Sequence, residues 1–108
     1  MIRKHEVWIV DDDKSIRWVL ERALQKVKVA CRSFDKASDV LVRLKNFEPN
    51  VIITDIRMPG MDGLSLLESV SEESPRTPVI IMTAYAELDR AGAAFRGGAF
   101  EYLPEPFD

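Results

Sequence analysis

Short apolar runs rich in β-branched residues alternate along the chain with segments whose apolar residues recur every three or four positions. Five of the runs have the length and composition of β-strands, at residues 7–10, 29–34, 51–54, 79–82 and 100–103. Helical spacing occurs between them, within residues 16–27, 37–44, 64–70 and 88–95. This alternation predicts βαβ units and therefore a parallel sheet in an α/β domain.

Residues at the ends of the predicted helices support these boundaries. The signals are Asp35 as an N-cap of the second helix, Asp62-Gly63 at the start of the third, and Gly97-Gly98 at the end of the fourth. The runs at 51–53 and 79–81 are continuously apolar, which is typical of central strands that helices cover on both faces. Trp8 and Trp18 are expected to pack against the core or its flank.

Composition excludes several classes of protein. The 108 residues are 46% hydrophobic and 31% charged, which is typical of one globular domain. With 18 acidic and 15 basic side chains the net charge is -3, so direct nucleic-acid binding is not expected. No apolar run approaches the roughly 18 residues of a membrane span. The single Cys31 allows no internal disulfide and fits a reducing cytoplasm, and the single His5 argues against histidine-based catalysis.

Polar side chains gather where the predicted strands end. In an open parallel sheet the carboxyl ends of the strands share one edge, and ligands bind there. These ends carry, in chain order, Asp11-Asp12-Asp13, Asp55, Thr83 and, between two prolines, Glu105.

The chemistry of these groups predicts a metal-assisted phosphoryl site. Clustered carboxylates repel one another and raise at least one pKa unless a cation compensates. Oxygen donors without histidine or thiolate neighbours favour a hard ion, Mg²⁺ or Mn²⁺. An aspartate beside such an ion can act as a nucleophile and form an acyl phosphate. The hydroxyl of Thr83 can donate to a phosphoryl oxygen.

Each of these residues alone has a simpler explanation. An acidic triplet before a helix is often only an N-cap, and an aspartate at a strand end is often only a loop residue. The triplet also resembles the start of an EF-hand loop, but Ile16 occupies the glycine position and Arg22 the glutamate position. The chain contains neither the phosphate-binding motif G-x-x-x-x-G-K-[ST] nor the dinucleotide-binding motif G-x-G-x-x-G, so the sequence does not support nucleotide binding. The convergence of several strand ends on one edge is what favours a functional site.

Three longer motifs carry a resemblance to a known family. They read Val-Asp-Asp-Asp at 10–13, Thr-Asp-Ile-Arg-Met-Pro-Gly-Met-Asp-Gly at 54–63, and Pro-Val-Ile-Ile-Met-Thr-Ala at 78–84. With them, the chain resembles a response-regulator receiver domain over essentially its whole length. Residues 15–24 and 98–104 resemble, more narrowly, the NtrC-type subfamily of nitrogen-regulation proteins.

The resemblance implies a fold and a site. The fold would be flavodoxin-like (CheY-like), a doubly wound parallel sheet of five strands in the order 2-1-3-4-5. Asp55 would accept a phosphoryl group from a sensor histidine kinase in a two-component phosphorelay. Mg²⁺ would be held by Asp12, Asp55 and the backbone carbonyl of Arg57. Asp11 would contribute directly or through water, and Asp13 is an alternative ligand.

The same resemblance implies a switch and a set of partners. Thr83 and Tyr102 match the family's hydroxyl and aromatic switch positions, which alter the surface after phosphorylation. Such a domain takes part in its own phosphorylation and dephosphorylation without being a classical enzyme. In cytoplasmic NtrC-type regulators it controls an ATPase domain and a DNA-binding domain that act in transcription, and neither domain is present here.

The chain departs from the family pattern at three places. Glu105 stands where the family has a lysine that contacts a phosphoryl oxygen, so we expect phosphorylation or its transmission to be weakened while Mg²⁺ binding survives. A receiver domain at residues 1–108 would be truncated before its fifth helix, and a homodimer is one way to cover the exposed face. Lys28 stands at a turn that glycine usually holds, at some cost in stability.

Two other functions compete with the receiver interpretation. A phosphorylation-independent interaction module would keep the fold while Glu105 impairs the switch. A phosphate hydrolase of the haloacid dehalogenase type would use the Asp-x-Asp pair of Asp11 and Asp13. However, its fifth motif position is Ser15 rather than threonine or valine, and the chain is too short for its usual core. A phosphoryl label on Asp55, on Asp11 or on neither would separate the three functions.

Overall fold

A computed structural model describes residues 2–56, 58, 60–84 and 101–105, with residues 83–84 and 101–105 described by their backbone alone. The described elements are β1 (Ile2–Arg3), β2 (Val7–Val10), α1 (Lys14–Lys26), β3 (Cys31–Phe34), α2 (Ala37–Leu44), β4 (Phe47–Glu48), β5 (Val51–Asp55), α3 (Gly63–Glu73), β6 (Val79–Ala84) and β7 (Glu101–Glu105). The helix expected within 88–95 and the glycines that should end it lie outside the described residues. Among the helices that are described, none has the length and apolar character needed to cross a membrane.

A five-stranded parallel sheet organises the chain, in the order β3-β2-β5-β6-β7. Numbered as the five predicted strands, this order is 2-1-3-4-5, so the predicted topology is confirmed. The register pairs Val10 of β2 with Thr54 of β5, and Thr54 in turn with Ile81 of β6. The carboxyl ends of these neighbouring strands therefore meet at one edge of the sheet.

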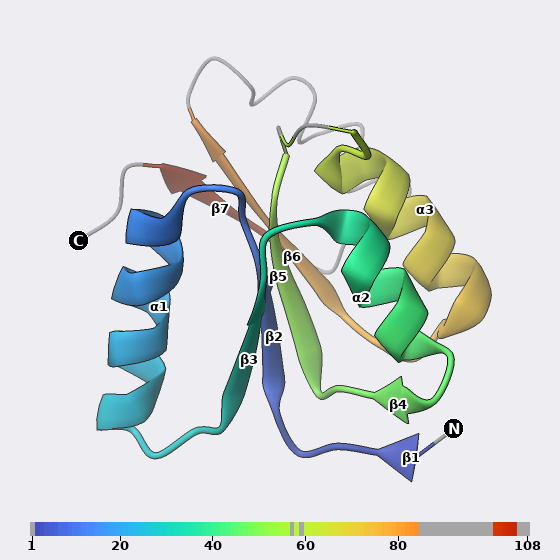
Figure 1. Cartoon of the computed structure of the whole chain (residues 1–108), viewed down its shortest axis with the longest axis horizontal. Coiled ribbons are helices and arrows are strands. Elements are labelled where there is room, and N and C mark those ends of the chain that lie inside the picture. The colour runs from blue at the N-terminus through green and yellow to red at the C-terminus, as the bar shows by residue number, and fades with distance from the viewer. Residues whose placement is uncertain (1, 57, 59, 85–100, 106–108) are drawn as a thin grey trace.

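Helices cover the sheet from both faces (Figure 1). On one face lies α1, while α2 and α3 lie side by side on the other. The main core fills the space between the sheet and the α2–α3 pair, with Trp8, Val40 and Leu66 completely buried. All four residues of β2 are buried, as expected for a strand in the middle of a covered parallel sheet. This packing fixes β2 and β5, the two strands that carry the site.

Helix α1 is more exposed than its amphipathic sequence suggests. The helix contributes no fully buried residue, and Val19 is 38% exposed. The expectation for Trp8 is confirmed, whereas Trp18 does not pack in the core: its side chain is 58% exposed. The Arg22 guanidinium lies 5.2 Å from the centroid of the Trp18 ring, so a cation–π contact takes the place of core packing.

Helix starts agree with the sequence signals in one case and differ in another. The Asp62 carboxylate accepts a hydrogen bond from the Ser65 backbone N–H at 2.9 Å, so the predicted start of α3 is confirmed. The expected N-cap of α2 is wrong. That position is held by Lys36, whose side chain makes no capping hydrogen bond, and Asp35 lies one residue too early.

The turn after α1 explains why β3 begins later than predicted. Lys28 has φ of 59°, the left-handed conformation that favours glycine, as the resemblance implied. Around it, the N–H groups of Val27 and Val29 donate to the carbonyl of Leu24 and end the helix. Residues 29–30 therefore belong to the turn, and the strand begins at Cys31.

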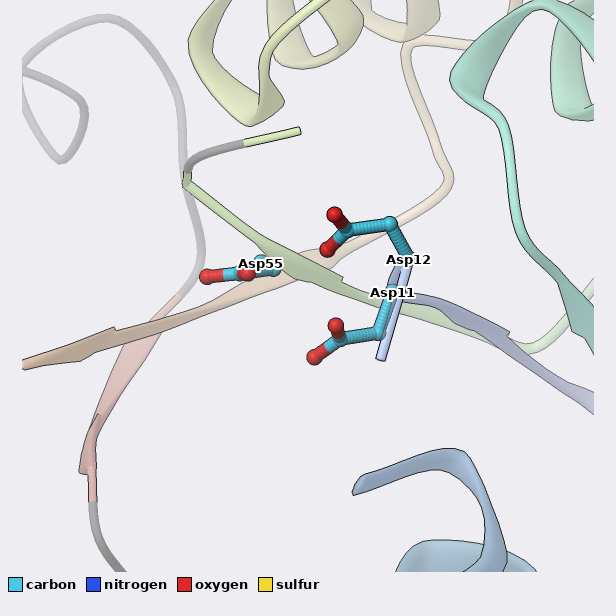
Figure 2. Close-up of side chains that lie close together, drawn as sticks. All are labelled: Asp11, Asp12 and Asp55. Atoms are coloured by element: carbon cyan, nitrogen blue, oxygen red, sulfur yellow. The ribbon is translucent and has the colours of Figure 1, made fainter. Parts of the chain in front are cut away.

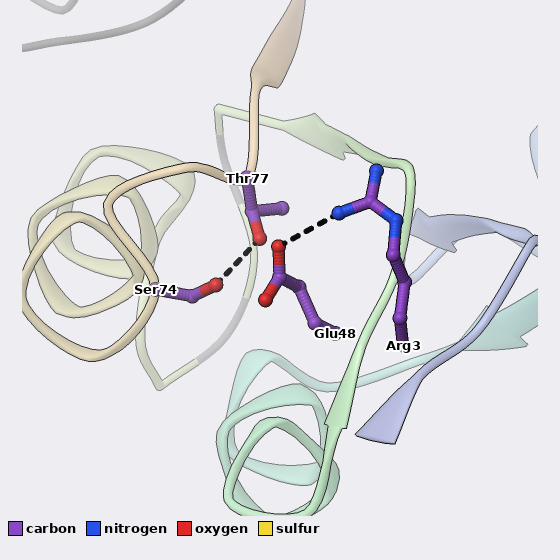
Figure 3. Close-up of polar contacts among 4 residues, drawn as sticks. All are labelled: Arg3, Glu48, Ser74 and Thr77. Atoms are coloured by element: carbon purple, nitrogen blue, oxygen red, sulfur yellow. Dashed lines mark hydrogen bonds and ion pairs between the residues drawn. The ribbon is translucent and has the colours of Figure 1, made fainter. Parts of the chain in front are cut away.

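A second, two-stranded parallel sheet pairs β1 with β4 at the pole opposite the carboxyl ends of the strands (Figure 1). The Arg3 guanidinium and the Glu48 carboxylate form an ion pair at 3.1 Å between these strands (Figure 3). Nearby, the hydroxyls of Ser74 and Thr77 are hydrogen bonded at 2.6 Å between the end of α3 and the segment before β6. Neither short strand could be predicted from the sequence, because two residues are too few to show a period.

Candidate functional site: an aspartate cluster at the strand ends

The site lies just beyond the paired ends of β2 and β5. Because Val10 and Thr54 are register partners in adjacent parallel strands, the residues that follow them are also neighbours. These residues are Asp11 and Asp55, and Asp12 follows Asp11 in the connection to α1. Figure 2 shows the three carboxylates gathered at this edge.

The three carboxylates are close enough to share one ion. Asp11, Asp12 and Asp55 each offer an oxygen, and these oxygens all lie within 4.8 Å of one another. The Asp11 side chain is buried, with 1% of its surface exposed, whereas Asp55 is half-buried and Asp12 is exposed. The cluster is therefore closed at its Asp11 side and open at its Asp12 side.

Hydrogen bonds within the acidic triplet fix the orientation of Asp11. The backbone N–H of Asp13 donates to Asp11 Oδ1 at 2.8 Å, and the Asp13 carboxylate accepts from the Ser15 N–H at 2.8 Å as the N-cap of α1. Asp13 therefore fulfils the simple capping role, and Asp11 and Asp12 face the cluster. The other Asp11 oxygen, Oδ2, is buried and has no hydrogen-bond partner among the described residues.

Burial and neighbouring charges hold the pKa of Asp11 above its ordinary value. Loss of solvent is the larger cause, and the negative charges of Asp55, Asp12 and Asp13 add to it. The hydrogen bond from the Asp13 N–H acts in the opposite direction. The result is a pKa of about 6. A cation beside Asp11 would favour the ionised form and lower this pKa.

The start of α3 lies directly against the backbone of Asp55. The Gly63 N–H donates to the Ile56 carbonyl at 2.8 Å. A Cβ added at Gly63 would lie 2.1 Å from the Asp55 carbonyl oxygen, far inside van der Waals contact. Glycine is therefore required at this position for α3 to approach the end of β5. In the sequence, Gly63 is visible only as part of a helix start, and its close approach to Asp55 is not.

A cavity of about 540 Å³ opens beside the exposed side of the cluster. Its walls come from the start of α2 and the segment before α3, and include Lys36, Ser38 and Met61. Asp12 lines the same cavity. The cavity therefore borders the cluster at Asp12, its exposed member.

The remaining predicted site residues are placed only by their backbone or not at all. Thr83 pairs with Pro104, and Ala84 with Glu105, so Thr83 and Glu105 lie at the ends of adjacent strands on the same edge as the cluster. Tyr102 pairs with Ile81, farther from that edge. Arg57, the expected source of a carbonyl ligand, lies outside the described residues.

The donor set fits a hard divalent cation. All three candidate ligands are carboxylates, which suit Mg²⁺ or Mn²⁺ better than a softer metal. Oδ2 of Asp11, which accepts no hydrogen bond from the described part of the chain, supplies a buried anionic oxygen in the cluster, where a cation would satisfy it.

This fold and site together define a class of protein. A doubly wound parallel sheet with aspartates at the ends of two adjacent central strands is the arrangement expected of a receiver domain. The family model of the response regulator receiver domain matches residues 7–108, so the chain belongs to this family.

Within the family, the chain is similar to the nitrogen regulator NtrC. It is 56% identical to the DNA-binding transcriptional regulator NtrC of Proteus hauseri over 107 residues, covering 99% of this chain and 23% of that protein. It is 55% identical to NtrC of Salmonella typhimurium over 102 residues, covering 94% of this chain and 22% of that protein. The chain thus spans less than a quarter of the length of these relatives.

Solved structures agree with the sequence comparison. The apo receiver domain of NtrC superposes with a TM-score of 0.85 at 53% identity, covering 96% of this chain and 84% of that one. The BeF3-activated receiver domain of NtrC gives a TM-score of 0.81 at 54% identity, covering 100% and 86%. The chain is therefore a response regulator receiver domain of the NtrC type, and the predicted family is confirmed.

Proposed function

We propose that Asp55 accepts a phosphoryl group from a sensor histidine kinase, with Mg²⁺ held beside it by Asp11, Asp12 and the Asp55 carboxylate itself. One observation carries this proposal: a buried carboxylate oxygen of Asp11 that no described residue hydrogen bonds, in a group of three carboxylates whose oxygens lie within 4.8 Å. The similarity to a receiver domain that is activated by BeF3, a phosphoryl mimic, supports it.

Each residue of the site has its own role in phosphoryl transfer. An Asp55 carboxylate oxygen attacks phosphorus while the bond from phosphorus to the donor nitrogen breaks, which leaves an acyl phosphate on the protein. A bound Mg²⁺ supplies positive charge to the transferring group. Asp11 and Asp12 would hold the ion, with the Arg57 carbonyl as a further expected ligand, and Asp13 remains the cap of α1. The Thr83 hydroxyl donates a hydrogen bond to a phosphoryl oxygen. Tyr102, the aromatic switch position, then helps to alter the surface of the domain after phosphorylation.

The partners and location belong to the same proposal. Relatives that are several times longer than this chain are DNA-binding transcriptional regulators. We place the domain upstream of an ATPase module and a DNA-binding module in the cytoplasm, where its switch surface regulates transcription. It catalyses only steps of its own modification and is not a classical enzyme.

Phosphorylation by a small-molecule donor tests the proposal. With acetyl phosphate and Mg²⁺, intact mass should show one added phosphoryl group on the parent protein. Asp55→Asn removes the nucleophilic carboxylate with little change in size and should show none. An equal gain in mass by the Asp55→Asn variant would contradict the assignment of Asp55.

The charge at Glu105 should weaken phosphorylation. Glu105 ends β7 beside the end of β6, on the same edge as the cluster. At about 4 Å and an effective dielectric near 20, two like charges repel by about 4 kcal/mol before relaxation and screening. A carboxylate in place of the family's lysine therefore opposes the anionic phosphorylated state, while it does not oppose a divalent cation.

Replacing Glu105 measures this effect. Glu105→Lys should increase the rate of phosphorylation by acetyl phosphate at least several-fold, and Glu105→Gln should give an intermediate rate because it only removes the negative charge. The Mg²⁺ dissociation constant should rise in the same order. If the parent is phosphorylated as fast as Glu105→Lys, the charge at this position does not limit the reaction.

A further inference from the structure

Arg17 reaches back from the first turn of α1 to the acidic loop. Its Nη1 atom donates a hydrogen bond to the backbone carbonyl of Asp11 at 2.5 Å. The Arg17 N–H also begins α1 by donating to the Asp13 carbonyl at 3.2 Å. The Arg17 side chain is half-buried. The guanidinium is therefore tied to the peptide that joins two of the proposed metal ligands.

This contact constrains the direction of two carboxylates at once. The Asp11 carbonyl and the Asp12 N–H belong to one rigid peptide plane, so holding the carbonyl fixes the rotation of that plane. On its other side, the Asp11 N–H donates to the Phe34 carbonyl of β3 at 3.1 Å. With both ends of Asp11 anchored, its side chain can present Oδ2 to the cluster and accept from Asp13 with Oδ1.

We propose that Arg17 is a positioning residue for the divalent-cation site, which it serves by anchoring the Asp11–Asp12 peptide. This inference rests on the proposed Mg²⁺ site. A guanidinium close to a cation site would by charge alone weaken metal binding. Positioning and charge therefore predict opposite effects of removing Arg17, and a single titration distinguishes them.

The chain offers a matched control on the same helix. Arg22 carries the same charge but stacks on the exposed Trp18 ring, and within the described residues it has no hydrogen bond or ion pair with the acidic loop. Arg17→Gln and Arg22→Gln therefore remove the same charge from α1, and only Arg17→Gln removes the contact to Asp11. Arg17→Lys keeps a charged donor and tests rescue.

Calorimetric titration with MgCl2 should show about 10-fold weaker binding for Arg17→Gln, the usual scale for loss of an outer partner of a metal ligand. Arg22→Gln should bind as the parent does or slightly more tightly, and Arg17→Lys should recover part of the loss. Equal or tighter binding by Arg17→Gln would overturn the proposal.

A second measurement does not depend on metal. In the metal-free protein, exchange of the Asp13 amide proton, followed by NMR, should be faster in Arg17→Gln than in the parent, because its acceptor on Asp11 is no longer held. Arg22→Gln should leave it unchanged. If the parent binds no Mg²⁺, the proposed function fails while faster exchange still supports the anchoring role. Unchanged exchange in Arg17→Gln overturns that role.

Discussion

At the scale of single residues, Asp11 combines deep burial with a negative charge that the hydrogen bond from the Asp13 N–H compensates only in part. Its pKa of about 6 in the folded protein, against 3.8 for an aspartate in water, means that the native state binds a proton more tightly than the unfolded chain does. Below about pH 4 Asp11 is protonated in both states and costs nothing. Between about pH 4 and 6, Asp11 ionises in the unfolded chain but stays protonated in the native state, so the free energy of unfolding falls. Above pH 6 the ionised Asp11 lowers the stability of the native state by about 3 kcal/mol.

Asp11→Asn should remove that penalty in the metal-free protein. The amide oxygen can still accept from the Asp13 N–H, and the amide N–H groups can donate to neighbouring carboxylates. Urea unfolding with a chelator present should show the variant stabilised by about 3 kcal/mol at pH 7 and by little at pH 4. A stability difference that does not change with pH would contradict this account of Asp11.

Residue-scale prediction from sequence worked where a local rule decides the outcome. The cap at Asp62 follows from the preference for aspartate before a helix, whereas the turn at Lys28 was expected only because the family usually has glycine there. The contact from Arg17 to Asp11 was not predictable, because it depends on how the chain turns between β2 and α1. Nothing in the spacing of the residues marks it.

At the scale of elements, α3 packs closely against the end of β5, where the proposed phosphoacceptor Asp55 lies. Gly63→Ala would place a Cβ 2.1 Å from the Asp55 carbonyl oxygen, so α3 or the end of β5 must move. We expect a loss of about 1–3 kcal/mol in stability, as for overpacked cores. Weaker Mg²⁺ binding should accompany it, measured by urea unfolding and calorimetry.

Gly60 provides the comparison within the same segment. Its φ is 82°, and a Cβ there would meet nothing within 4 Å. Gly60→Ala should therefore cost about 1–2 kcal/mol of backbone strain and leave Mg²⁺ affinity close to that of the parent. Equal losses of Mg²⁺ affinity in both variants would mean that the close contact between Gly63 and Asp55 does not determine the affinity of the site.

At the scale of the whole molecule, the parallel sheet was predictable because each strand and helix shows its own period, whereas the strand order followed only from the resemblance to receiver domains. The position of the site was predictable too, since parallel strands place their carboxyl ends on one edge. The pairing of β1 with β4 and the exposure of Trp18 were not. An amphipathic pattern shows that one face of a helix is apolar, but not how closely another element covers it.

The net charge of the molecule reflects this site. Without the triplet and Asp55, the chain would carry a net charge of +1 instead of -3. The acidity is thus concentrated at one edge of the sheet rather than spread over the surface. One bound Mg²⁺ would offset two of these four negative charges, and a phosphoryl group on Asp55 would restore about two.

The most direct test of the central claim is to locate the phosphoryl group chemically. After reaction with acetyl phosphate, borohydride converts an aspartyl phosphate to homoserine, and peptide mass spectrometry identifies the residue. The account predicts conversion at Asp55, dependent on Mg²⁺, with Asp11, Asp12 and Asp13 unmodified. Conversion at Asp11, or conversion at Asp55 that proceeds equally well with a chelator, would contradict it.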